Sequence, residues 1–561
     1  MAATLTDTIR IAVAQLDSVV GDIDGNLKKA RAARAEAATA GADLLVLSEL
    51  FIAGYPPEDL VLKPAFQDAC RSAVEALATD TADGGPGVVV GSPWPQDGKC
   101  YNAVALLDGG RIEGVRFKVE LPNYGVFDEL RVFAVGPLPG PVGFRGLRLG
   151  LPICEDIWFE QVPECLLETG AEILISPNGS PYWQGKEDVR HQVALARIVE
   201  TGLPIVYVNQ CGGQDELVFD GGSFGLNGDR TLAFQMAQFD AGIAVTTWKK
   251  TAGAWRSVDG PKAALSGREE ANWRACVAGL RDYVNKNGFP GVVLGLSGGI
   301  DSAVVAAMAV DALGRDRVHC VMLPYRYTAQ ESLADAAAIA ATLGIRYDVV
   351  PIAPPVEGFT EVLQPLFAGR EADITEENLQ SRARGTILMA ISNKFGSMVL
   401  TTGNKSEMSV GYATLYGDMN GGFNPIKDLY KTEVYDLARW RNASKPHDAL
   451  GPSGRVIPEN VITRAPTAEL RPGQTDQDSL PPYAVLDDIL ECLVEGEMRV
   501  AEVVARGHDA ATVKKVERLL YLAEYKRRQA APGVKITKRN FGRDRRYPIT
   551  NKFRDRGQST A

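Results

Sequence analysis

The chain has 561 residues, of which 45% are hydrophobic and 23% are charged, and its formal net charge at pH 7 is −10. This length predicts two to four domains, the acidic balance disfavours binding to nucleic acid, and no apolar run reaches the roughly 18 residues that a membrane span needs. Eight cysteines are scattered singly, with no Cys-x-x-Cys pair. This usage argues against a zinc ribbon or a disulfide framework and predicts a reducing, cytoplasmic setting.

Short apolar strands dominate the first half of the chain. An apolar run at 9–16 is followed by an Ala-, Lys- and Arg-rich helical pattern at 26–40 and by a second buried strand, 43–49, which ends at Glu49. Further short strands are expected at 88–91, 103–107, 147–153, 173–176 and 205–209. Gly, Pro and Asn separate these strands, which predicts a layered, strand-rich α/β domain.

Three residues at expected strand ends form a set suited to amide hydrolysis: Glu49, Lys118 and Cys154. Taken singly each is ordinary, because a lone cysteine after a strand usually belongs to the core and a strand-end Glu or Lys is usually solvated. Together, a Cys154 thiolate can attack an amide carbonyl, Glu49 can take and return the proton, and Lys118 can stabilise the oxyanion. None of the four histidines lies in a Cys/His signature, so a papain-type site has little support.

The strings around these residues resemble the three motifs of the nitrilase superfamily. They are Leu44–Phe51, Lys118–Glu129 and Ile153–Trp158, in the order of the family, and the resemblance covers residues 9–248. It implies an αββα sandwich with a Glu-Lys-Cys amidase site. Within the second string, Glu129 either orients Lys118 as a second carboxylate or merely solvates a loop.

The resemblance extends to glutaminase members through Tyr124 and the loop at 176–182. It implies that Tyr124, Ser180 and Lys186 bind the amino-acid end of glutamine, with the Lys186 cation suiting its α-carboxylate. Family members often carry Arg at the position of Lys186, and Lys is a point charge rather than a bidentate fork. Ser180 can equally be an ordinary turn residue.

The pattern changes after residue 248. The stretches 249–254 and 257–264 predict a linker, so we expect a glutaminase domain at 1–250, a linker at 251–265 and a second domain at 266–561. In this second domain a helix is expected at 269–287, followed by strands at 318–323 and 347–351 on either side of a helix at 332–343. The alternation predicts a doubly wound parallel sheet with ligands at the carboxyl ends of its strands.

A glycine-rich turn joins an apolar strand, which begins at Val292, to an Ala-rich helix. Its residues are Gly295, Leu296, Ser297, Gly298, Gly299, Ile300, Asp301 and Ser302. Glycines turn backbone N–H groups toward a ligand and the helix start adds positive charge, so the turn suits a phosphate. It is not the P-loop pattern, because no Lys follows the second Gly; Asp301 instead offers a carboxylate to Mg²⁺. The octet resembles the pyrophosphate-binding loop of the ATP pyrophosphatases, which cleave ATP to AMP and pyrophosphate.

Further strings in the second half resemble the NAD synthetases, which amidate deamido-NAD to NAD with ATP. They are Asn378–Arg384, Thr401–Glu407, Asn424–Lys431, Arg464–Pro472 and Gln474–Asp476, and the resemblance runs from about residue 264 to the C-terminus. Because the first half resembles an amidase, the whole chain resembles the glutamine-dependent form of this family.

The resemblance also implies the residues of the second site. The turn at 295–302, Thr402 and Lys431 would contact ATP; Asn378, Arg384, Glu407 and Lys526 would face deamido-NAD; Asp301 and Glu407 would hold Mg²⁺. Glu407 thus has two implied roles, which places it where metal and substrate meet. Leu415 stands where ammonia-only members often have Lys, so that contact is missing or made by another residue. The long Pro- and Gly-rich segment 452–482 is expected to be a lid over bound substrate.

The expected function is glutamine-dependent NAD synthesis, in an enzyme that is at least a homodimer. One alternative is another amidating ligase with the same ATP loop, of the GMP or asparagine synthetase type, but those resemble different glutaminase partners. A second is a plain amidase whose C-terminal half only binds a regulatory nucleotide, which would release no pyrophosphate. A third is an idle glutaminase half, against which the intact Glu49, Lys118 and Cys154 argue.

Overall fold

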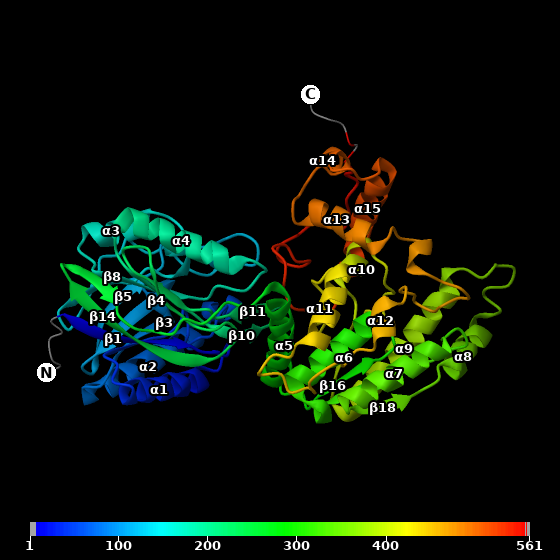
Figure 1. Cartoon of the computed structure of the whole chain (residues 1–561), viewed down its shortest axis with the longest axis horizontal. Helices are drawn as coiled ribbons and strands as arrows, with labels where there is room; N and C mark the ends of the chain where they lie inside the picture. Colours follow the sequence, from blue (N-terminus) through cyan, green and yellow to red (C-terminus); the bar gives the residue numbers. More distant parts are fainter. Residues whose placement is uncertain (1–6, 556, 558–561) are drawn as a thin grey trace. The chain divides into compact units, whose positions relative to one another are not determined.

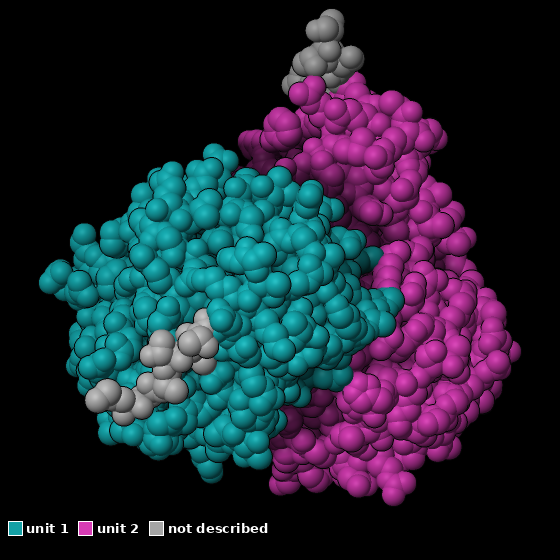
Figure 2. All heavy atoms as spheres, turned by 60° about the vertical axis from the view of Figure 1, so that its left-hand side comes forward, with its two compact units in different colours: residues 1–267 teal, residues 268–561 magenta. Residues whose placement is uncertain are grey.

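The computed structural model of the chain describes residues 7–555 and residue 557. They divide into two compact units, residues 1–267 and 268–561 (Figure 2). Within the described part of the chain, no helix is both long enough and apolar enough to cross a membrane.

Unit 1 contains two packed sheets covered by helices on both outer faces (Figure 1). The first sheet has the order β15 (Ala254–Ser257), β14 (Gly242–Thr251), β1 (Thr8–Gln15), β2 (Leu44–Val46), β3 (Gly87–Gln96), β4 (Lys99–Asp108), β5 (Arg111–Phe117). The second has the order β13 (Leu232–Gln235), β12 (Phe224–Leu226), β9 (Ile205–Asn209), β8 (Ile173–Asn178), β7 (Leu147–Gly150), β6 (Val142–Phe144). The helices are α1 (Ile23–Thr39), α2 (Pro64–Asp80), α3 (Gln161–Glu168) and α4 (Lys186–Thr201), and a β10–β11 hairpin spans Cys211–Gln214 and Leu217–Asp220. The predicted αββα sandwich is confirmed.

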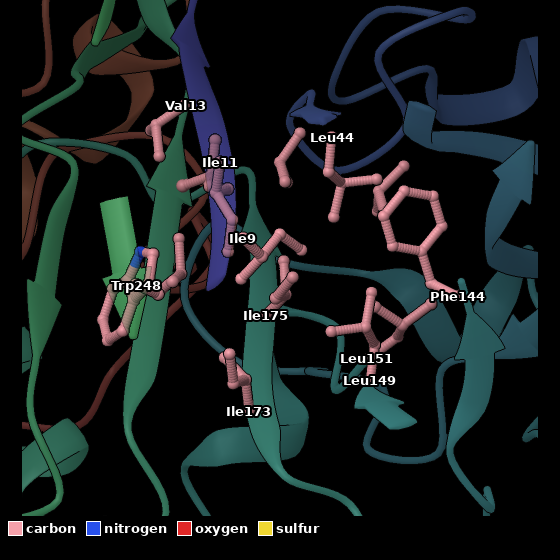
Figure 3. Close-up of a cluster of buried hydrophobic side chains, with 14 of the residues drawn as sticks. Ile9, Ile11, Val13, Leu44, Phe144, Leu149, Leu151, Ile173, Ile175 and Trp248 are labelled. Carbon is pink, nitrogen blue, oxygen red and sulfur yellow. The ribbon is translucent and has the colours of Figure 1, made fainter. Parts of the chain in front are cut away.

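Alternation along β1 explains how this sandwich forms. Ile9, Ile11 and Val13 point into the core between the sheets, where they meet Ile175 of β8 and Trp248 of β14 (Figure 3). The intervening alanines of β1 pack instead with the apolar sides of α1 and α2. Since side chains alternate across a strand, large residues on one face and alanines on the other let β1 serve both layers.

The structure differs from the expected linker at 251–265. Residues 254–257 form β15, an edge strand paired antiparallel with β14, and Trp255 is buried in the core between the sheets. Ala252 and Gly253 both have positive φ, +51° and +86°, which is the backbone of a two-residue hairpin turn. The Thr-Ala-Gly signal therefore marks a hairpin rather than a domain boundary.

Unit 2 is built on a parallel sheet with the order β18 (Arg346–Val349), β17 (Val318–Met322), β16 (Val292–Gly295), β19 (Met398–Leu400). Helices around it are α5 (Arg268–Lys286), α6 (Ile300–Leu313), α7 (Gln330–Leu343), α8 (Ala353–Leu363), α9 (Ile374–Phe395), α10 (Lys405–Val410) and α11 (Lys431–Ala443). The remaining helices are α12 (Glu459–Thr463), α13 (Tyr483–Val494), α14 (Val500–Ala505), α15 (Ala510–Leu522) and α16 (Glu524–Arg527). The predicted parallel sheet is confirmed, with β16 at its centre and the glycine-rich turn at the carboxyl end of β16.

Candidate active sites

The unit 1 residues Glu49, Lys118 and Cys154 follow the ends of three strands. Glu49 does not close its strand as expected, because β2 ends at Val46 and Glu49 lies in the turn three residues on; likewise β7 ends four residues before Cys154. Lys118 directly follows β5. These strand ends come from both sheets, so the side chains meet inside the sandwich.

A lysine held by two carboxylates is the centre of this site. The Nζ of Lys118 donates to Oε1 of Glu49 at 2.7 Å and to Oε1 of Glu129 at 2.9 Å, and all three side chains are buried. Burial alone would lower the pKa of Lys118, but the negative charges of Glu129 and Glu49 outweigh it and raise that pKa well above its usual value. Lys118 is therefore a fixed cation, and Glu129 orients it rather than solvating a loop.

Cys154 begins a short 3₁₀ turn, Cys154–Ile157, with φ of +45°, a conformation that a non-glycine residue adopts only when its surroundings impose it. Burial and the charge of Glu49 raise the pKa of its thiol well above the usual value, and Lys118 only partly offsets them. The resting group is thus a neutral thiol, which needs a base to become a nucleophile.

Asp156 is a buried residue beside the site that sequence reasoning did not single out. Its Oδ1 accepts backbone N–H groups of Val119 at 2.9 Å and Glu120 at 2.8 Å, and its Oδ2 accepts that of Ile153 at 2.9 Å. One buried carboxyl therefore ties the segment after Lys118 to the turn that carries Cys154. The available signal was an acid inside the cysteine string, but two of its three partners, Val119 and Glu120, lie more than 30 residues away.

The three residues expected to bind glutamine surround this site in different ways. The hydroxyl of Tyr124, which is about half exposed, donates to Oε1 of Glu155 at 2.8 Å. The ammonium of Lys186 lies 4.2 Å from the ring centroid of Trp158. Burial raises the pKa of Glu155, and the charge of Lys186 is among the groups that oppose this shift. Tyr124 and Lys186 thus flank one carboxylate next to Cys154.

Ser180 is more deeply buried than an ordinary turn residue. Its backbone N–H donates to Oδ1 of Asn209 at 2.9 Å, and its Oγ accepts from Nε of Arg190 at 3.1 Å. Arg190 itself forms a buried ion pair with Asp220 at 2.9 Å. This network fixes the orientation of Ser180, and no motif in the sequence pointed to Arg190.

A cavity of about 310 Å³ in unit 2 collects most of the second set of expected residues. Its lining includes seven of the eight turn residues, together with Arg384, Thr402, Glu407 and Lys431. Gly298, the eighth, has φ of +80°, and a Cβ there would lie 2.3 Å from the carbonyl oxygen of Ser332. Only glycine fits, because both the backbone conformation and the space exclude a side chain.

Two carboxylates converge on one ammonium at this cavity. Nζ of Lys431 lies 2.5 Å from Oδ2 of Asp301 and 3.1 Å from Oε1 of Glu407. Burial raises the pKa of Glu407 to about 8, although Lys431 opposes the shift. Among the described residues no group of three or more His, Cys, Asp or Glu is arranged to hold a metal. Mg²⁺, however, typically takes one or two protein carboxylates and completes its shell with substrate phosphates and water, so Asp301 and Glu407 fit this ion.

Asn378 and Lys526 lie outside the residues that line the cavity. Oδ1 of Asn378 accepts from Oγ1 of Thr414 at 3.0 Å, while Nζ of Lys526 donates to the carbonyls of Gly411 at 2.7 Å and Ala413 at 2.6 Å. Both therefore support the turn at 411–414, and Ala413 of this turn lines the cavity. At Leu415, where a Lys was expected, the backbone carbonyl accepts from Nε of Arg382 at 3.2 Å.

The segment 452–482 forms one wall of the cavity. Arg464 donates to the carbonyl of Gly298 at 3.0 Å, and Oγ of Ser332 donates to Oε1 of Glu469 at 2.6 Å. Gln380 of α9 donates to the carbonyl of Leu470 at 3.0 Å. The segment contains helix α12 and is anchored to the glycine-rich turn, α7 and α9.

Fold and sites together define a class of enzyme: an amidohydrolase-type unit with a Glu-Lys-Cys site, joined to an α/β unit with a phosphate-type turn. Two family models match the chain, "Carbon-nitrogen hydrolase" at residues 10–257 and "NAD synthase" at residues 272–530. Glutamine-dependent NAD(+) synthetase of Rhodobacter capsulatus is 52% identical over 98% of this chain and 100% of that protein; the Thermotoga maritima protein of the same name is 44% identical over 98% and 99%.

A solved structure agrees over the same length. Glutamine-dependent NAD+ synthetase from Acinetobacter baumannii, in complex with adenosine diphosphate, has 42% identity and a TM-score of 0.77, covering 97% of this chain and 99% of that chain. The chain belongs to the glutamine-dependent NAD(+) synthetases.

Proposed function

We propose that the chain forms NAD from deamido-NAD, with ATP as the activating substrate and glutamine as the nitrogen donor; AMP, pyrophosphate and glutamate are the other products. The observation that carries this proposal is the presence, in one member of this family, of both sites: the Lys118–Glu49 pair beside Cys154 and the cavity around the turn at 295–302. Each site supplies chemistry that the other lacks.

In unit 1, Glu49 takes the thiol proton of Cys154, and the thiolate attacks the side-chain carbonyl carbon of glutamine. The oxygen becomes an anion that the Lys118 ammonium stabilises. Collapse of this tetrahedral species breaks the C–N bond, the Glu49 proton goes to the departing ammonia, and a γ-glutamyl thioester remains. Water activated by Glu49 then hydrolyses the thioester to glutamate and restores the thiol.

The amino-acid end of glutamine carries both an ammonium and a carboxylate. We assign the carboxylate to Lys186 and Ser180, and the mouth of the site to Tyr124. Lys186 is held near the Trp158 ring, and Ser180 by Arg190, so both positions are set before substrate arrives.

In unit 2, the nicotinate carboxylate of deamido-NAD attacks the α-phosphorus of ATP, and pyrophosphate leaves with its bridging oxygen. Ammonia then attacks the acyl carbon of the adenylate, AMP leaves, and loss of a proton gives the amide. The turn at 295–302, Thr402 and Lys431 are assigned to ATP; Asn378, Arg384, Glu407 and Lys526 are assigned to deamido-NAD. Arg384 lines the cavity, whereas Asn378 and Lys526 act by shaping the turn at 411–414.

Asp301 and Glu407 are assigned to Mg²⁺. The convergence of both carboxylates on the Lys431 ammonium supports this choice, because the same two groups already share one cation. When bound, the ion neutralises charge on the phosphates of ATP. Lys431 keeps the two carboxylates together before the ion and substrate arrive.

The assembly is proposed to be at least a homodimer in the cytoplasm, with no nucleic-acid or membrane partner. Exposed apolar side chains on and between α8 and α9 support an assembly; they include Val362, Leu366, Ile374 and Phe395. Light scattering of the full chain tests it: a mass of one chain at micromolar concentration would reject the dimer.

The test of the reaction is stoichiometric. Full-length protein with deamido-NAD, ATP, Mg²⁺ and glutamine should release one AMP, one pyrophosphate and one NAD per turnover of the synthetase site. Nucleotide binding without pyrophosphate release would favour the regulatory-module alternative. Pyrophosphate release without NAD would reject deamido-NAD as the acceptor.

A further inference from the structure

Asn102 is a fully buried residue of β4 beside the Glu-Lys-Cys site. Its backbone carbonyl accepts the N–H of Lys118 at 2.8 Å, so strand β4 fixes the backbone position of Lys118. None of the three motif strings contains it. Its side chain is nevertheless the one amide that contacts both carboxylates on Lys118 among the described residues.

Both hydrogen bonds of this side chain go to carboxylates. Nδ2 of Asn102 donates to Oε1 of Glu49 at 2.7 Å and to Oε2 of Glu129 at 3.3 Å. Oδ1, in contrast, is buried and has no hydrogen-bond partner among the described residues. Leaving a buried acceptor unpaired costs free energy. The hydrogen bonds from Nδ2 to the two carboxylates therefore set the orientation of this amide.

The other contacts show what Asn102 adds. On Glu49, Lys118 and Asn102 share Oε1, and the backbone N–H of Gly179 donates to Oε2 at 2.8 Å. On Glu129, Lys118 and the Tyr55 hydroxyl share Oε1, so Asn102 is the donor to Oε2. Two buried carboxylates therefore share one ammonium, and Asn102 spans the gap between them without adding charge.

We propose that Asn102 is a positioning residue for glutamine hydrolysis, which fixes Glu49 and Glu129 relative to Lys118. This inference rests on the proposed glutaminase function of unit 1. Burial raises the pKa of Glu129, and N–H donors to a carboxylate oppose such a shift. The charged or titratable groups that face the pair are Lys118, Tyr55, Cys154 and Glu155.

The test is Asn102→Leu, which keeps the volume of the side chain and removes both N–H donors. The matched control is Asn227→Leu, because Asn227 is also buried in unit 1 but its side chain, among the described residues, bonds only Thr231 and Ser257. Glutamine hydrolysis by the full chain is measured between pH 5.5 and 9 with deamido-NAD, ATP and Mg²⁺ present. Ammonium-driven NAD formation is measured on the same preparations.

The expected result for Asn102→Leu is a fall in kcat of about ten- to a hundredfold, as for a lost hydrogen bond to a charged group, with KM changed less than about threefold. The acid limb of the pH profile should move up by about one pH unit, because the buried Glu129 takes up a proton more readily without this donor. Ammonium-driven synthesis should stay within about twofold of wild type, and Asn227→Leu should leave the limb in place.

Two results would overturn the proposal: an unchanged kcat and acid limb in Asn102→Leu, or a loss that Asn227→Leu reproduces without any shift of the limb. If Asn102→Leu does not fold, Asn102→Ser tests the proposal instead. The small serine side chain fits the site but lacks the second N–H donor. Should wild type itself fail to hydrolyse glutamine, the proposed function fails instead, which is a separate outcome.

Discussion

The two sites hold a lysine between two carboxylates in different surroundings. Lys118 with Glu49 and Glu129 is sealed, with side-chain exposures of 0, 0 and 7%, whereas Asp301 and Glu407 around Lys431 are 18 and 16% exposed and face a cavity. A sealed cluster cannot exchange its cation, so it suits a catalytic site that must be rigid. An open cluster can admit a second cation with its substrate, so it suits a phosphate-transfer site.

The largest expected effect comes from removing the sealed cation. Lys118→Ala leaves Glu49 and Glu129 uncompensated in the interior, at a cost of about 3–5 kcal/mol, and removes the oxyanion partner. Glutamine-driven NAD formation should fall on the order of 10³-fold, while ammonium-driven formation persists. Exposed Lys28→Ala is the control; equal loss with both nitrogen sources would show that Lys118 serves only the fold.

Asp301→Asn tests the open cluster. Losing one of two carboxylates should reduce NAD formation about a hundredfold with either nitrogen source and raise the Mg²⁺ concentration needed for half-maximal rate. Titrating Mg²⁺ in the ammonium-driven assay measures this. Asp316→Asn, whose side chain is almost fully exposed, serves as control, and an unaltered Mg²⁺ requirement in Asp301→Asn would argue against a metal role.

Gly298→Ala tests whether ATP binding at the open site depends on the backbone of the glycine-rich turn, as the sealed site depends on its ion pairs. The added Cβ meets the Ser332 carbonyl, so the turn must shift, and we expect KM for ATP to rise about tenfold. Gly454→Ala is matched in φ, +82°, but has nothing within 4 Å. If both variants bind ATP alike, backbone strain rather than the clash would explain any effect.

An ion pair between buried Arg34 and exposed Asp83 supplies the smallest effect and a reference for both clusters. Arg34 holds the pKa of Asp83 at about 2 through a side-chain hydrogen bond. The folded-state pKa is below the unfolded value of 3.8, so the stabilisation is present above about pH 4 and is lost as pH falls toward 2. Asp83→Asn should lower the free energy of unfolding at pH 7 by less than about 1 kcal/mol, which lowers Tm slightly.

That difference in Tm should shrink as the pH falls from about 4 toward 2 in thermal unfolding scans. A Tm difference that grows on acidification would contradict the assigned pKa direction. Comparison with Lys118→Ala then shows how much burial increases the cost of breaking a pair.

Much of the fold could be predicted from the sequence, and so could the glycine-rich turn and the string that contains Cys154, because strand alternation and motif order are local properties. The residues that lock the sealed site were not. Asn102 and Tyr55 meet Glu129 across 27 and 74 residues, and the tertiary fold, not sequence spacing, brings them there. Asp156 was visible in a string, but its distant backbone partners Val119 and Glu120 were not.

Errors in the elements have similar causes. The predicted strand at 43–49 ends at Val46 because the chain must turn to bring Glu49 under Lys118. The linker prediction missed β15 because a hairpin turn and a domain boundary share Gly and small polar residues. The roles of Asn378 and Lys526 stay predictions, since both contact the 411–414 turn rather than the cavity.

The measurement that tests the division of labour most directly compares wild type with Cys154→Ala. Each makes NAD from deamido-NAD, ATP and Mg²⁺, first with glutamine and then with ammonium. The account predicts that the variant loses glutamine-driven synthesis and keeps ammonium-driven synthesis near the wild-type rate. Synthesis from glutamine in the variant, or loss with both nitrogen sources, would contradict it.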